Sequence, residues 1–114
     1  MSAQESPAAT VEQLRLGAGF GEEERPRVLE VFRKLDRRLK RFSAGAVDMQ
    51  LSVKERDTPS QKLTLECWIA GRDRIVATST ETDLGDALMD CREDLWRQID
   101  DAVNRRIDRS RKES

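Results

Sequence analysis

Residues 47–54 read VDMQLSVK and residues 63–70 read LTLECWIA, and in the first seven positions of each an apolar residue stands at every second place. Because successive side chains of a β-strand point to opposite faces, each stretch predicts a strand with one buried and one exposed face. A polar loop over residues 55–62 separates the two strands, and the turn at residues 71–73 leads into a third strand over residues 74–80. The three strands are expected to form an antiparallel meander.

Helical periodicity flanks this meander. The apolar spacing predicts an amphipathic helix over residues 22–42, with Pro26 in its first turn, and a longer helix over residues 83–109. Thr82 or Asp83 is the expected cap of the second helix. The apolar positions are Val28, Val31, Phe32, Leu35, Leu39 and Phe42 in the first helix, and Leu84, Ala87, Leu88, Cys91, Leu95, Ile99 and Ala102 in the second.

Upstream of the first helix, residues 11–16 predict a short strand that the helix connects to the meander. The order β-α-β-β-β-α predicts an α+β fold in which two helices pack on one face of a four-stranded sheet. This arrangement is similar to the fold of double-stranded RNA-binding domains. We expect one domain over residues 11–109, a disordered leader over residues 1–10 and a charged tail over residues 110–114.

Composition excludes several functions. A chain of 114 residues is long enough for one small core, which excludes a two-domain enzyme. It has no histidine, the commonest general base and zinc ligand, and we find neither a catalytic constellation nor a metal site. Cys67 and Cys91 are expected to be buried thiols of a reduced, cytoplasmic protein. No apolar run is long enough to span a membrane, and we expect no cofactor and no small-molecule substrate.

Basic residues gather on one side of the first helix. Residues 25–41 contain eight basic and two acidic residues. Those that project opposite the apolar stripe are Arg33, Lys34, Arg37, Lys40 and Arg41. A row of cations of this kind neutralises phosphates of a nucleic-acid backbone, with an affinity that falls steeply as salt rises. From the residues alone, the alternative to nucleic-acid binding is that these basic residues form an ordinary solvated helix surface.

Five short motifs carry a resemblance to a known family. They are FRKLD at residues 32–36, LTL at residues 63–65, AGRDRIVA at residues 70–77, DLGDALMD at residues 83–90 and DLWRQI at residues 94–99. Together with the element order, they resemble the single-domain ribosome hibernation-promoting factors, ribosome-associated inhibitors that occupy the small subunit. The likeness covers about residues 11–109.

The resemblance implies binding to the small ribosomal subunit and its rRNA near the decoding centre, in the channel used by messenger and transfer RNA. Translation is then silenced by occupancy, as in a stress response, and no reaction is catalysed. The implied RNA-binding residues are Arg33, Lys34, Arg37, Lys40 and Arg41 of the first helix, with Arg97, Arg105 and Arg106 of the second.

The second helix departs from the family pattern because it is acidic. Asp94, Asp100 and Asp101 stand where the family commonly has basic residues, and residues 81–101 contain eight acidic and two basic residues. Acidic groups repel phosphates, so either only Arg97 and the basic C-terminal residues reach RNA, or the binding surface has changed.

An alternative function fits the same fold: a protein-interaction or dimerisation module that does not bind the ribosome. Its surface would be the acidic second helix, a row formed by Met89 and Trp96, or the sheet near Trp68. Met89 and Trp96 could equally pack against the first helix. Trp68 falls on the strand face opposite Cys67, where it is either exposed or covered by a loop or tail.

Overall fold

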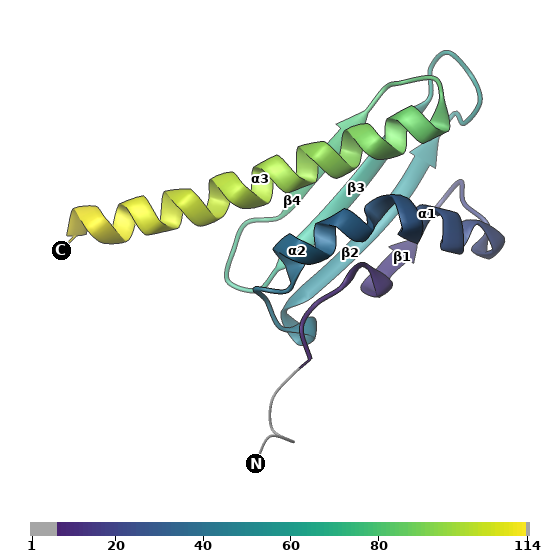
Figure 1. Cartoon of the computed structure of the whole chain (residues 1–114). Helices are drawn as coiled ribbons and strands as arrows, with labels where there is room; N and C mark the ends of the chain where they lie inside the picture. The colour runs from purple at the N-terminus through teal and green to yellow at the C-terminus, as the bar shows by residue number, and fades with distance from the viewer. Residues whose placement is uncertain (1–6, 114) are drawn as a thin grey trace.

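The structure, a computed structural model, describes residues 7–113, with side chains described as far as Asn104. This range contains three α-helices and four strands (Figure 1). The helices are α1 (Arg25–Phe32), α2 (Asp36–Leu39) and α3 (Leu84–Glu113). The strands are β1 (Leu14–Leu16), β2 (Val47–Lys54), β3 (Lys62–Ile69) and β4 (Ile75–Ser79).

The strands form one sheet in the order β1-β2-β3-β4. β1 is parallel to β2, because α1 and α2 carry the chain back between them, whereas β2, β3 and β4 are antiparallel neighbours. The helices lie together over one face of this sheet (Figure 1). The predicted α+β class and the order β-α-β-β-β-α are therefore confirmed.

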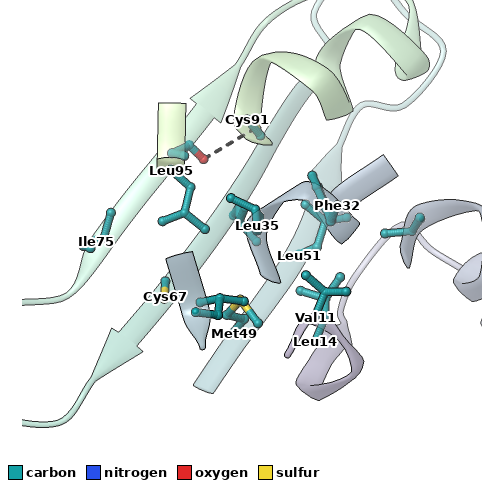
Figure 2. Packing of buried hydrophobic residues seen from close by; sticks show 14 of the residues in the cluster. Val11, Leu14, Phe32, Leu35, Met49, Leu51, Cys67, Ile75, Cys91 and Leu95 are labelled. Carbon is teal, nitrogen blue, oxygen red and sulfur yellow. Dashed lines mark hydrogen bonds between the residues drawn. The ribbon is translucent and has the colours of Figure 1, made fainter. Parts of the chain in front are cut away.

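The core lies between the helices and the covered face of the sheet. In β2 and β3 every second residue is buried, as the period of two predicted. Phe32 and Leu35 from the first helical region, Leu51 from β2 and Leu95 from α3 belong to one cluster and are each at most 1% exposed (Figure 2). Burial of each such side chain contributes about 1.5–3 kcal/mol, so this cluster stabilises the fold and fixes which face of each helix looks outward.

The first helix is not continuous over residues 22–42, so that prediction is wrong in detail. A 3-10 turn, Arg33–Leu35, separates α1 from α2, and α2 ends at Leu39. Side chains three residues apart lie above one another in a 3-10 turn, which lets Phe32 and Leu35 enter the core together. After Leu39, the Phe42 N–H donates to the Leu39 carbonyl (2.9 Å) and closes the last turn.

The predicted strand over residues 11–16 is confirmed only at β1. Residues 11–13 form a 3-10 turn because distant groups take their hydrogen bonds. The Val11 N–H donates to Asp36 Oδ1 (2.9 Å), and Gln13 Nε2 donates to the carbonyls of Ala44 (2.7 Å) and Val47 (2.9 Å). These bonds tie the N-terminal segment to α2 and to the start of β2.

The prediction of a disordered leader is wrong for residues 7–10. Ala9 is fully buried, and its N–H donates to the Phe42 carbonyl (2.9 Å). Thr10 caps the 3-10 turn that follows it. Residues 1–6 lie outside the described residues.

α3 is longer than predicted. Asp83 caps it, as expected, because Asp83 Oδ2 accepts the Asp86 N–H (2.9 Å). The helix continues past Arg109 to Glu113, through most of the segment predicted to be a tail, and projects beyond the sheet (Figure 1). No helix of the described residues is long and apolar enough to cross a membrane.

β4 is an edge strand of the sheet, and α3 supplies partners for it. Gln98 Nε2 donates to the Val76 carbonyl (2.9 Å), and Ser79 Oγ donates to Asp90 Oδ2 (2.9 Å). The first contact satisfies a backbone carbonyl that an edge strand otherwise leaves open, and the second pairs the buried Ser79 hydroxyl. They also fix how α3 lies against the sheet.

Cys67 and Cys91 are fully buried, and burial raises the pKa of each thiol to about 12. Only a thiolate attacks a disulfide reagent, so at about pH 8 both thiols should remain unlabelled in the folded protein and both should react after unfolding. Thiol titration with a chromogenic disulfide reagent measures this, with a Ser60→Cys variant at an exposed position as the reactive control. Rapid labelling of either native thiol would contradict the burial.

Candidate nucleic-acid interface

The outer side of α1 and α2 carries a row of exposed cations. The five first-helix residues predicted to contact RNA are all exposed there. Arg27 is exposed as well and extends the row by two turns, although sequence reasoning did not include it as a site residue. Its spacing of seven from Lys34 was the available signal. We call this surface the basic face; it consists of Arg27, Arg33, Lys34, Arg37, Lys40 and Arg41.

Most charges of the basic face have no anionic partner among the described residues. Arg33 is the exception, with Arg33 Nη2 at 3.1 Å from Glu12 Oε2. Both side chains of that pair are more than half exposed, so the pair contributes little and opens readily. The basic face is therefore available to an external anion.

Arg38 belongs to a different site, although it lies in the same basic stretch of sequence. Its guanidinium lies over the Trp96 ring, 3.8 Å from the ring centroid. The same group donates to both carboxylate oxygens of Asp100, each at 3.2 Å. Arg38 therefore ties α2 to α3, and its contact neutralises one acidic residue of α3.

These contacts also show which way the basic face is turned. Arg33 reaches Glu12, on the β1 side of the helix, whereas Arg38 reaches α3 on the other side. Arg92 of α3 donates to the Val31 carbonyl (3.1 Å), so Val31 also lies on the α3 side. The basic face consequently projects outward and away from α3.

α3 presents a row of exposed acidic residues on its own outer side, which we call the acidic face: Asp86, Asp90 and Glu93. These three residues line a shallow groove together with Glu81 and Met89. The concentration of like charge in the first turns of α3 repels phosphates and attracts cations.

The three acidic residues that depart from the hibernation-factor pattern have separate surroundings. Asp100 is paired with Arg38, and Asp94 Oδ1 lies 3.1 Å from Arg97 Nη2. Asp101 is exposed. Two of these acids are thus partly neutralised, which weakens the repulsion that the sequence implies.

Of the three α3 residues predicted to bind RNA, only Arg97 has a described side chain, and it is not part of the basic face. Arg97 is exposed on α3, but its guanidinium pairs with Asp94 of the same helix. The side chains of Arg105 and Arg106 lie outside the described residues.

The two tryptophans lie on different faces of the molecule. Trp96 is partly buried between the helices under Arg38, which is the packing alternative that the sequence left open. Trp68 lies opposite Asp48 on the uncovered sheet face and is half-buried, with the Arg15 guanidinium 6.0 Å from its ring centroid. Arg15 also hydrogen-bonds Asp48 and lowers the pKa of that carboxyl.

The described residues contain no group of three or more His, Cys, Asp or Glu side chains placed to hold a metal ion. Comparisons with models of protein families, with curated proteins and with solved structures find no significant match. The resemblance to ribosome hibernation factors and to double-stranded RNA-binding domains therefore stays a prediction.

The contact of Arg38 with Trp96 and Asp100 predicts a measurable loss of stability. Arg38→Leu removes a cation–π contact and a part-buried ion pair, so the free energy of unfolding should fall by about 1–2 kcal/mol. Arg41→Leu, an exposed residue of the same stretch, should change it by at most about 0.5 kcal/mol. Urea denaturation of both variants tests this, and equal effects would show that the contact contributes nothing.

Proposed function

We propose that this protein binds RNA through the basic face and that its target is rRNA of the small ribosomal subunit near the decoding centre. Bound there, the protein inhibits translation by occupying the channel of messenger and transfer RNA. The observation that supports this proposal is the row of exposed cations, largely without partners among the described residues, on a rigid helical surface. The choice of the ribosome comes from the family resemblance.

Phosphate contacts are the chemistry that this surface can provide. Arginine presents a planar fork of donors that matches a phosphate, and lysine adds a mobile point charge. Folded RNA presents its backbone and shape rather than readable base edges in its deep groove, so a cationic helix is sufficient for binding. The core behind α1 and α2 holds the cations in a fixed row.

The acidic face is compatible with this mode of binding because of its position. The basic face projects away from α3, and Arg38 pairs with Asp100 between the two helices. RNA that lies along α1 and α2 therefore meets the basic face first. The acidic face, Asp86, Asp90 and Glu93, lies on α3, farther from the RNA. In this proposal the protein is a binding factor of the cytoplasm, without a cofactor and without a catalysed reaction.

The test is co-sedimentation with purified small subunits. Binding should occur at about 50 mM salt and weaken by about a thousandfold near 200 mM, as expected for six phosphate contacts. Arg33→Glu combined with Arg37→Glu should weaken binding by about a hundredfold at low salt. The number of counterions released on binding, obtained from the slope of log affinity against log salt concentration, should fall by about two. Inhibition of translation in a purified system should fall in parallel.

A matched control is available on the opposite side of the molecule. Lys54 and Lys62 are exposed and face each other on β2 and β3, so Lys54→Glu with Lys62→Glu changes the net charge by the same amount. This variant should bind nearly as the unmodified protein does. An equal loss of ribosome binding in both double variants would mean that only net charge matters. Binding that is retained after Arg33→Glu and Arg37→Glu would contradict the assignment of the basic face.

A further inference from the structure

Arg92 is a nearly buried cation on the side of α3 that faces α1. Its side chain is only 13% exposed. Arg92 Nη1 donates to the Val31 carbonyl (3.1 Å), and Arg92 Nε donates to Glu93 Oε2 (3.0 Å). The Glu93 side chain is 61% exposed, and a pair with so exposed a carboxylate contributes little. The partner that holds the guanidinium inside the helical layer is therefore the Val31 carbonyl.

The Val31 carbonyl lies where the first helical region changes its winding. In a continuous α-helix this carbonyl would accept the Leu35 N–H, four residues further on. In the 3-10 turn Arg33–Leu35 each N–H reaches back only three residues, as the Asp36 N–H does to the Arg33 carbonyl. Arg92 thus supplies a donor to a carbonyl whose α-helical donor has turned elsewhere. A side chain that enters the ladder of helical hydrogen bonds in this way is a known cause of a break in a helix.

The break changes where the side chains that follow it point. An α-helix turns by about 100° per residue and a 3-10 helix by about 120°, so three residues of 3-10 winding advance α2 by about 60°. Counted from Arg27 in α1, Arg37 lies within about 20° in the broken helix but about 80° away in a continuous one. Arg38 does the reverse, because it lies about 80° away in the broken helix and within about 20° in a continuous one.

The observed contacts agree with the broken winding. The Arg38 guanidinium lies over the Trp96 ring and pairs with Asp100, so this side chain is turned toward α3. Arg37 is exposed and has no anionic partner among the described residues. The winding of the 3-10 turn therefore decides which of two adjacent arginines belongs to the basic face.

Core packing permits both windings. By the same count, Leu35 and Leu39 lie within about 60° of Phe32 whether or not the helix is broken, so both side chains can stay buried. Polar contacts at the break then select one winding. Asp36 Oδ1 accepts the Val11 N–H (2.9 Å) on the β1 side, and Arg92 binds on the α3 side. The bond from Arg92 has a charged donor, which makes it the stronger kind.

We propose that Arg92 is a positioning residue for the basic face. By donating to the Val31 carbonyl, Arg92 stabilises the 3-10 turn, and the turn brings Arg37 into line with Arg27 and directs Arg38 onto α3. Arg92 acts through these residues and does not itself contact RNA, because its guanidinium is held between the helices. Its part in binding rests on the proposed function, which assigns Arg37 to the phosphate backbone.

NMR spectroscopy of the protein without RNA tests the winding. Arg92→Met keeps an unbranched apolar side chain but removes the donors, so the Leu35 N–H should return to the Val31 carbonyl. A contact between the Val31 α-proton and the Leu35 amide proton, typical of an α-helix, should then appear. The Trp96 indole signal should shift as Arg38 leaves its ring.

Two matched controls separate the contacts of Arg92. Arg92→Lys keeps the charge and a donor, and it should restore the 3-10 turn at least in part. Glu93→Gln removes only the charge of the exposed partner and should leave the turn unchanged. Arg92→Ala removes the side chain without adding bulk and serves as a second variant, with the same expected result as Arg92→Met.

Co-sedimentation with small subunits at about 50 mM salt tests the consequence for binding. In the unmodified chain, Arg37→Gln should weaken binding by about tenfold and Arg38→Gln by less than about threefold, since only the first removes a phosphate contact. In the Arg92→Met background the order should reverse, because Arg38 then points outward. A purely stabilising role of Arg92 would lower stability without exchanging the effects of the two arginines.

Two results would overturn the inference. The first is that both Arg92→Met and Arg92→Ala keep the 3-10 turn. The second is that the turn is lost while Arg37 remains the stronger contact with the small subunit. Failure of the unmodified chain to bind small subunits would instead contradict the proposed function, and the NMR comparison would still decide whether Arg92 holds the turn.

Discussion

The alternation of β2 and β3 is the constraint on which the rest of the structure depends. Met49 faces Cys67 and Leu51 faces Leu65 across the two strands, and all four side chains point to the covered side of the sheet. A shift of the pairing by one residue would turn one strand's apolar set toward water, so burial fixes the register. With that face defined, each helix has only one place to bury its own apolar stripe, and the helical layer forms there.

The charged surface is a consequence of this packing. Since 38% of the residues are charged and the core excludes them, the outer sides of the helices must carry dense charge. The contact of Arg38 with Trp96 and Asp100 then decides how that charge is distributed. It uses one cation and one anion between the helices, and the basic face and the acidic face stay apart on either side of it. The sign of the charge on each of these two faces comes from the sequence, whereas the spacing and direction of the faces come from helix packing.

The parts of the fold that were predictable are those governed by local periodicity. The strands β2 and β3 and the buried sides of the helices follow from spacings of two and of three to four, and the cations of α1 and α2 were identified as exposed for the same reason. The turn at residues 11–13 and the placement of Ala9 were not predictable, because they depend on bonds to Asp36, Ala44 and Phe42, distant in sequence. The pairing of Arg38 likewise requires knowing that α2 lies against α3. Arg38 and Arg37 are neighbours of identical type, and only the packing separates their roles.

The hydrogen bond from Gln98 to the Val76 carbonyl has a consequence for how the protein behaves when it is concentrated. A sheet edge with free carbonyls offers a template on which another chain can add a strand and begin a cross-β aggregate. Here the β4 edge is occupied in part by a side chain of α3, and β1 at the other edge has only three residues. Both edges of the sheet are therefore poor templates on which a strand of another chain could add.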